Sequence, residues 1–454
     1  MSPTDALSTE DDATDTRTGL PHTVKTRTAK VRRANFASAW LGWMLDGFET
    51  YSIVLVGGLV VTDLVGQGAS PLYFGTILAV QLIAWAVGGL ASGVLIDYFG
   101  RRRVLMVSIL TYAIATGLAA LSPNFAIFLV LRIIAGLGMG AEWGPGSALI
   151  AETWSDHTRG RGVALLQCAF GVGFLVATGV FWMLGPTEPG TWRWMLAIGG
   201  LPALIVLFVR RRVGESPMWQ DADKRRRAAI ARARSGETLE AQERALTTFT
   251  LRRLFSDPTS RSRMLKLLAL SAASLVGWWA VSTWVPVYAG AAVKAAGAAP
   301  TTTTLIVVAY NVGGVVGWLV WGVLADTLGR RWALFSYFAG ALVLTWVLFG
   351  IHYSSLGVLT LVIAINGFFT LGQMGWMATY PGELFPTHLR GSAITVVFNV
   401  SRVFAAAGAL LAGSIVGGLG GIATAALAIG SIYVLGLVFA LIAGPETKGR
   451  PLPD

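Results

Sequence analysis

The chain has 454 residues, of which 54% are apolar and only 13% are charged, and its mean hydropathy is +0.63. About a quarter of the residues of a typical soluble domain are charged, so these values exclude a soluble globular protein and predict a membrane protein. The formal net charge of +11 does not call for a nucleic-acid partner, because basic loops on one side of a membrane account for it.

Twelve apolar stretches follow one another along the chain when it is read in windows of about 20 residues, the helical length that crosses the hydrocarbon core. They predict an all-α membrane protein with twelve transmembrane helices. The stretches lie near residues 36–61, 72–96, 104–121, 124–150, 163–185, 192–209, 264–289, 303–325, 332–351, 356–380, 391–414 and 420–443.

Lys and Arg alternate between connectors that are rich in base and connectors that are nearly free of it. The rich connectors include Arg101 to Arg103, the long loop from Arg210 to Arg263, and the tail with Lys448 and Arg450. Because basic loops stay on the cytoplasmic side, we expect a multi-pass protein of the cell (inner) membrane with both termini in the cytoplasm.

Side chains that carry metal or covalent chemistry are scarce. The single cysteine, Cys168, lies in the fifth apolar stretch, and the four histidines lie in tails or loops without metal-ligand spacing. We therefore expect no metal and no other cofactor. No nucleophile–base pair is visible in the spans, so an enzyme is not expected.

Two sequence words occur twice at nearly the same offset. GVLIDYFGRR at 93–102 returns as GVLADTLGRR at 322–331, and ETWSDHTRG at 152–160 returns as ELFPTHLRG at 383–391. We interpret this as a duplicated bundle with a polar linker, which is either solvated or folds into an amphipathic surface helix over 231–246. The expected parts are a disordered tail (1–35), a six-helix bundle (36–212), the linker (213–263), a second six-helix bundle (264–443) and a second tail (444–454).

The repeated word also matches the loop signature G-x-x-x-D-x-x-G-R-R, and LRIIAGLGMG at 131–140 matches the pattern R-x-x-x-G-x-G-x-G. On these motifs the chain resembles the major facilitator superfamily over nearly the whole membrane region. DGFE, GAEWGPGSALIAE and STWVPVY are similar to the organic-acid proton symporters of sialate, aromatic acids and other carboxylates, whereas GESPMW, ELFPTHLRG and PETKG are similar to sugar porters.

The resemblance implies a secondary active transporter that works by alternating access, with proton-coupled symport of a small carboxylate as the leading hypothesis. Sugar and proton symport is the alternative, and a receptor that binds solute without moving it is an alternative from another class. The expected partners are a small organic acid, protons and the lipid bilayer, and the protein is expected to be a monomer.

The repeated words predict a cytoplasmic gate. Asp97 and Arg101 are four residues apart at a helix end, which allows an ion pair, and Gly93 lets another backbone approach. The resemblance implies that Asp97 faces the N-terminus of a helix from the other half. Alternatively the arginines only set topology, although matched acids in both copies speak against this. The expected gate residues are Gly93, Asp97, Arg101, Arg102, Glu152, Arg159, Asp326, Arg330, Arg331, Glu383 and Arg390.

Five ionisable residues inside the spans have no charged counterpart in the other half of the chain: Asp46, Glu49, Arg132, Glu142 and Arg402. Charges inside a membrane are costly, and they usually face a cavity or pair with one another. Depth along the helices favours pairing of the helix-one acids with Arg132, so we expect Asp46, Glu49 and Arg132 to carry proton coupling, with Asp46 as the first choice.

Arg402 has no acid within two turns, and its planar guanidinium suits bidentate carboxylate recognition. Asn399, one turn earlier, can add a hydrogen bond. Alternatively Arg402 forms a structural bridge to Glu142 or to backbone carbonyls, and the other polar and aromatic candidates only pack or bond between helices. The expected substrate-binding residues are Arg402, Asn399, Glu142, Gln167, Trp284, Asn311 and Gln373.

Overall fold

The computed structural model describes residues 22–69, 72–154, 157–185, 190–201, 214–238, 240, 243, 250–299 and 301–453. All regular elements in these ranges are helices, which confirms the predicted all-α class. The first group of helices is α1 (His22–Leu64), α2 (Leu72–Phe99), α3 (Arg101–Ala119), α4 (Phe125–Thr153), α5 (Arg159–Leu184) and α6 (Thr191–Gly199).

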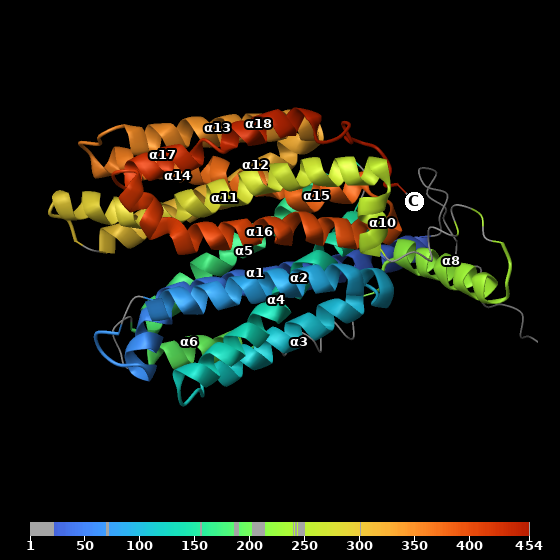
Figure 1. Cartoon of the computed structure of the whole chain (residues 1–454), viewed down its shortest axis with the longest axis horizontal. Coiled ribbons are helices and arrows are strands. Elements are labelled where there is room, and N and C mark those ends of the chain that lie inside the picture. Colours follow the sequence, from blue (N-terminus) through green and yellow to red (C-terminus); the bar gives the residue numbers. More distant parts are fainter. Residues whose placement is uncertain are drawn as a thin grey trace, which may run out of the picture.

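The second group follows a connecting segment that holds α8 (Pro217–Arg234) and α10 (Thr250–Ser256). It comprises α11 (Pro258–Ala295), α12 (Thr301–Thr327), α13 (Arg330–Gly350), α14 (Leu356–Gly372), the 3₁₀ turn η2 (Gln373–Gly375), α15 (Trp376–Leu384), α16 (Thr387–Gly418), α17 (Ile422–Gly430) and α18 (Tyr433–Ile442). Figure 1 shows the two groups as two bundles of nearly parallel helices lying side by side.

Ten helical segments of the described residues are long and apolar enough to cross a membrane. Two of them join neighbouring elements: Leu356–Leu384 joins α14 to α15, and Ile422–Ile442 joins α17 to α18. The eleventh expected stretch lies in α16, which has 32 residues, and the sixth, 192–209, is described only as far as residue 201.

The two bundles meet through α2 against α16 and through α5 against α12. The first glycine of each repeated word lies in these contacts. A Cβ on Gly93 would come within 3.3 Å of the Ser392 Cα, and a Cβ on Gly322 would come within 3.1 Å of the Arg161 Cα. These two positions require glycine because each lets a helix of the opposite bundle approach closely.

The linker differs from the sequence-based expectation. Its long helix is α8, which ends at Arg234. The alternative of a helix over 231–246 is wrong in the described part, because Gly236 has a φ of +82°, which ends a helix. Two helices begin earlier than expected: α1 begins at His22, inside the expected tail, and α11 begins at Pro258, inside the expected linker.

The elements α8 and α10 and the described tail residues 444–453 gather at one end of the bundles, which we call the linker end (Figure 1). There α8 contacts the last turn of α2. Trp219 Nε1 and Arg226 Nη1 both donate hydrogen bonds to the Asp97 carbonyl oxygen, at 3.0 and 2.8 Å. The linker helix is therefore attached to the segment that carries the first repeated word.

Candidate functional site

Asp97, near the end of α2, binds the beginning of α16 in the other bundle. Its Oδ2 accepts hydrogen bonds from the Ser392 backbone N–H at 3.1 Å and from the Ser392 hydroxyl at 2.7 Å. The Arg101 Nη1 lies 3.7 Å from the Asp97 Oδ1, and both side chains are fully buried. The acid thus joins the two bundles close to a helix N-terminus, where negative charge is favourable.

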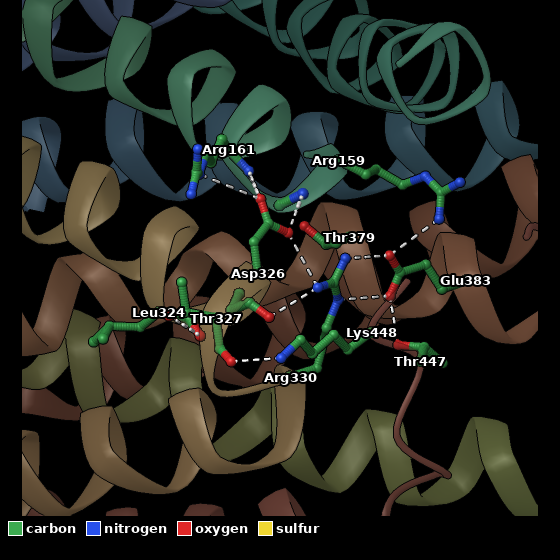
Figure 2. Close-up of polar contacts among 12 residues, drawn as sticks. Arg159, Arg161, Leu324, Asp326, Thr327, Arg330, Thr379, Glu383, Thr447 and Lys448 are labelled. Carbon is green, nitrogen blue, oxygen red and sulfur yellow. Dashed lines mark hydrogen bonds and ion pairs between the residues drawn. The ribbon is translucent and has the colours of Figure 1, made fainter. Parts of the chain in front are cut away.

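Asp326, at the matching position of the second repeated word, makes the same kind of contact in the opposite direction. The backbone N–H groups of Gly160 and Arg161, at the N-terminus of α5, each donate to its carboxylate at 3.0 Å. Arg330 Nη1 lies 3.1 Å from the Asp326 Oδ1 (Figure 2). Each bundle therefore contributes one acid to the helix start of its partner.

Glu383, from α15, forms ion pairs with two arginines at this end. Its Oε1 lies 2.7 Å from Arg330 Nη2 and 3.2 Å from Arg159 Nη1, and its Oε2 accepts from Arg330 Nε at 3.0 Å. Arg159 belongs to α5, so this pair also crosses between the bundles, as Figure 2 shows. Separating Glu383 from its arginines leaves these charges without partners, so the ion pairs must form again whenever this end closes.

Two acids that the sequence analysis did not assign to the gate complete it. Glu215 accepts from the backbone N–H groups of Arg101 and Arg102 at 3.0 and 3.1 Å, and Glu446 accepts from those of Arg330 and Arg331 at 2.9 and 3.2 Å. Each carboxylate caps the helix that follows a repeated word. Their 231-residue offset, from 215 to 446, equals that of the second repeated word and is a signal that could have found them.

The hydrogen bonds that Glu446 accepts from backbone N–H groups affect its ionisation. Burial raises the pKa of this carboxyl, but the four backbone N–H groups of Arg330, Lys448, Arg331 and Thr447 outweigh burial and hold the pKa below its ordinary value. The ionised form of Glu446 therefore stabilises the folded state.

The remaining gate candidates use backbone acceptors. Arg390 donates to the carbonyl oxygens of Gly382 and Pro453, each at 2.9 Å, and Arg331 donates to the Leu441 carbonyl oxygen. The side chain of Glu152 lies outside the described residues.

In the interior, the structure separates the two helix-one acids. Glu49 forms a buried ion pair with Arg132 of α4, and the Thr116 hydroxyl of α3 donates to the same Glu49 oxygen at 2.9 Å. Arg132 Nη2 donates to Thr116 at 2.7 Å. The predicted pairing of a helix-one acid with Arg132 therefore holds for Glu49 and not for Asp46.

Asp46 instead lies in electrostatic range of Glu142 from α4 and of Arg402 from α16. Asp46 and Glu142 are buried, and neither oxygen of the Asp46 carboxylate has a hydrogen-bond partner among the described residues. The Glu142 carboxylate interacts with the Tyr112 hydroxyl of α3. Arg402 is 4% exposed. Asp46 thus interacts electrostatically with a second acid and with a base, and it forms no salt bridge with the described residues.

Arg402 lies between aromatic rings. Its guanidinium carbon is 3.8 Å from the ring centroid of Trp85 and 4.3 Å from that of Phe398, and its Nη1 is 3.4 Å from the Asn399 Oδ1. Phe398 stacks in turn on Trp143, with centroids 4.1 Å apart. These rings fix the position of the cation without neutralising its charge.

A central cavity of about 30 Å³ adjoins Arg402. This volume holds roughly two water molecules and no larger solute. Both bundles line the cavity, with Trp43, Trp85 and Gln167 from the first and Trp278, Trp279 and Trp318 from the second among its residues.

Five of the seven expected substrate-binding residues are not among those that line this cavity, namely Asn399, Glu142, Trp284, Asn311 and Gln373. Trp284 is buried in the apolar core, Asn311 donates to the Val307 carbonyl oxygen of its own helix at 2.9 Å, and the Gln373 Oε1 accepts from Ser274 at 3.0 Å. Gln167 does line it, and it accepts from Trp143 Nε1 at 3.0 Å.

Several tryptophans that line the cavity have an indole N–H without a hydrogen-bond partner. The indole Nε1 atoms of Trp43, Trp85, Trp279 and Trp318 are buried and have no hydrogen-bond partner among the described residues. Buried indole N–H groups usually find an acceptor. These four tryptophans and Arg402 come from both bundles and lie around the cavity.

Comparisons with known proteins bear on this geometry. The family profile described as "Sugar (and other) transporter" matches residues 20–454. The probable 4-methylmuconolactone transporter of Cupriavidus pinatubonensis is 29% identical over 92% of this chain and 91% of its own length. The cis,cis-muconate transport protein of Acinetobacter baylyi is 29% identical over 89% of this chain and 93% of its own length. The niacin transporter NiaP of the same organism is 27% identical over 91% of this chain and 93% of its own length.

Among solved structures, the chain is similar to the major facilitator superfamily proton:xylose symporter XylE bound to 6-bromo-6-deoxy-D-glucose, with a TM-score of 0.74, 21% identity and coverage of 94% of this chain and 98% of the other. The partially occluded inward-open form of the Escherichia coli xylose transporter XylE has a TM-score of 0.65 at 19% identity, with coverage of 93% and 100%. These similarities show the fold.

Proposed function

Because the chain belongs to the sugar (and other) transporter family, whose members are membrane transporters and not enzymes, we propose that it carries a small organic anion together with protons by alternating access. Its substrate site is the central cavity beside Arg402. The linker end faces the cytoplasm, as the Lys and Arg distribution of the loops favours.

The observation that carries the choice of an anion is Arg402, a buried cation that lines the cavity and forms no salt bridge with the described residues. Four tryptophans whose buried indole N–H groups have no hydrogen-bond partner among the described residues also line the cavity. A carboxylate supplies acceptors without adding donors, so it satisfies these groups. A sugar brings several hydroxyl donors that need acceptors, and the carbonyl oxygen of Gln167 is already hydrogen-bonded to Trp143.

The relatives support the same class, since their names specify muconate, methylmuconolactone and niacin. Sugar uptake remains the second candidate, because the sugar-bound xylose symporter shares the fold. A solute receptor would have no need of two matched contacts at Asp97 and Asp326 that join the bundles.

Charge balance supplies a reason for proton coupling. With both acids ionised, Asp46, Glu142 and Arg402 sum to −1, so a monoanion entering the cavity would bring the total to −2. A proton on Asp46 removes one negative charge and releases Arg402 from its electrostatic interaction with Asp46. Proton binding and anion binding therefore favour each other, and by linkage the effect is reciprocal.

The closed linker end and the small cavity support alternating access. Asp97, Asp326 and Glu383 hold the bundles together at this end, and the cavity has no room for a solute. The bundles must separate for a substrate to enter, and the inter-bundle contacts must break and form again in each cycle.

Substrate uptake into proteoliposomes tests the proposal, with cis,cis-muconate, niacin and xylose as probes under an imposed proton gradient. We expect uptake of at least one carboxylate and none of xylose. Arg402→Lys keeps the charge but loses the planar fork, so carboxylate affinity should fall about ten- to a hundred-fold, the range expected for a hydrogen bond to a charged group.

Arg193→Lys is the matched control. Arg193 forms a half-exposed ion pair with Asp63, and neither residue lines the cavity, so this substitution should leave carboxylate affinity unchanged. Xylose uptake, or parental carboxylate affinity in Arg402→Lys and Arg402→Gln, would contradict the assignment.

A further inference from the structure

A surface groove of about 510 Å³ separates the beginning of α11 from the end of α18. One wall carries Thr259, Ser262, Arg263 and Lys266 of α11, and the other is the apolar segment 442–445. The volume lies in the range of small-ligand sites, and the groove shares no lining residue with the central cavity.

The groove has a net positive character. Lys266 is half-buried and has no hydrogen bond or ion pair to any described residue. Arg263 donates from Nη1 to the Leu384 carbonyl oxygen at 3.1 Å, which leaves further N–H groups of its guanidinium for a ligand. Of the nearby acids, Asp257 caps Ser260 and interacts electrostatically with Arg263, and Glu446 is directed at backbone amides.

Large apolar side chains flank the basic pair. Leu265 on α11 is 55% exposed, and Val438 and Ile442 on α18 are 51% and 50% exposed. In a membrane protein such side chains face lipid chains. Arg263 and Lys266 lie at the start of one predicted apolar stretch (264–289), and Ile442 lies at the end of another (420–443), so the groove is at the boundary between headgroups and hydrocarbon.

We propose that this groove binds one anionic phospholipid of the cytoplasmic leaflet. Its phosphate interacts with Lys266 and Arg263, the hydroxyls of Thr259 and Ser262 donate to the headgroup oxygens, and its acyl chains lie along Leu265 and Ile442. The combination of free donors with adjoining exposed apolar side chains favours a lipid over a soluble phosphate. The site is independent of the transported solute.

Native mass spectrometry of the full-length protein in detergent tests the site, with phosphatidylglycerol, phosphatidylcholine and glycerol 3-phosphate as probes. Lys266→Gln should weaken binding of the first phosphatidylglycerol about five-fold, the effect of one basic residue near an anionic surface, and Lys266→Arg should restore it. Arg261→Gln is the matched control, because Arg261 is exposed on the same turn of α11 but does not line the groove.

Ser262→Asp, at an exposed position, introduces a negative charge and should weaken phosphatidylglycerol binding even if Lys266→Gln fails to fold. Parental binding in both Lys266→Gln and Ser262→Asp would overturn the proposal. Three further results would also overturn the proposal. Equal weakening in Arg261→Gln would show diffuse attraction, and equal binding of phosphatidylcholine would show no charge selectivity. Binding of glycerol 3-phosphate as tight as that of the lipid would show a soluble-phosphate site.

Discussion

Asp46 on α1 and Arg402 on α16 come from different bundles and interact electrostatically in the protein interior. They form no salt bridge, and the Asp46 carboxylate has no hydrogen-bond partner among the described residues. The charge of Asp46 therefore acts on the proposed substrate cation without occupying its donors. This arrangement lets one proton change the attraction of the cavity for an anion.

Asp46→Asn should uncouple proton and anion movement. Since an amide carries no charge and cannot exchange a proton, we expect the anion to bind with weaker pH dependence than in the parent, and gradient-driven accumulation to be lost while counterflow exchange continues. Anion affinity measured from pH 5 to 8 and uptake into proteoliposomes check this. Undiminished accumulation would remove Asp46 from the mechanism.

Glu49→Gln should act differently, on stability. Removing one partner of the buried Glu49–Arg132 pair leaves an uncompensated charge, which costs about 3–5 kcal/mol. We expect a lower unfolding temperature for the purified Glu49→Gln variant, whereas Asp46→Asn should unfold near the parental temperature because it breaks no hydrogen bond between described residues. Equal effects of the two variants would contradict the separation of roles.

Asp97→Asn should destabilise the closed linker end. The side chain loses its charge toward Ser392 and Arg101, and a hydrogen bond to a charged group contributes about 1.5–3 kcal/mol, so the closed form should become at least about ten-fold less populated. Thr395 of α16 is buried against Gly93 of α2, so a Thr395→Cys reporter in a Cys168→Ala background should then react faster with thiol reagents. Asp326→Asn should give the same result from the other bundle, and unchanged labelling in both would show that neither acid closes the gate.

Glu446→Gln should remove a pH-dependent contribution to stability. Because the folded-state pKa of Glu446 is below its ordinary value of 4.5, its contribution is fully present above pH 4.5 and is lost as the pH falls through the folded-state pKa. The unfolding temperature of the parent should exceed that of Glu446→Gln at pH 7, and the difference should shrink below pH 4.5. A difference that is constant with pH would mean that ionisation of Glu446 is not responsible.

Trp85→Phe should weaken anion binding while keeping an aromatic ring over Arg402. The substitution removes the unpartnered N–H of a residue that lines the cavity. If this N–H binds the substrate, affinity should fall about two- to ten-fold, because a neutral hydrogen bond contributes about 0.5–1.5 kcal/mol. Trp284→Phe is the matched control because Trp284 does not line the cavity. Isothermal titration with the transported carboxylate checks this, and equal affinities for Trp85→Phe and Trp284→Phe would exclude the indole as a ligand donor.

The amino-acid sequence by itself determined the helical membrane class, the resemblance to the family and the two repeated acids at the linker end. Hydropathy is a local property, so windows of one helix length predict the apolar helices without knowledge of their packing. The repeated words place Asp97 and Asp326 at equivalent helix ends, where the structure finds them. The same offset would have identified Glu215 and Glu446, had it been applied to every acid in the chain.

Only the tertiary structure decided which charges meet in the interior. Asp46 and Glu49 are three residues apart, which places them roughly 60° apart around α1 and about 4.5 Å apart along it. Either could reach a cation on another helix, and the choice depends on where α3, α4 and α16 lie around α1. Thr116, which is hydrogen-bonded to both Glu49 and Arg132, lies 67 residues from the first and 16 from the second.

The cavity wall likewise depends on helix rotation. Trp279 lines the cavity and Trp284 packs in the core, because five residues turn an α-helix by roughly 140° from its starting direction. A sequence with three tryptophans in one span does not state which direction faces the other bundle. Packing of α11 against α16 and α18 sets that rotation, and with it the donors that a substrate meets.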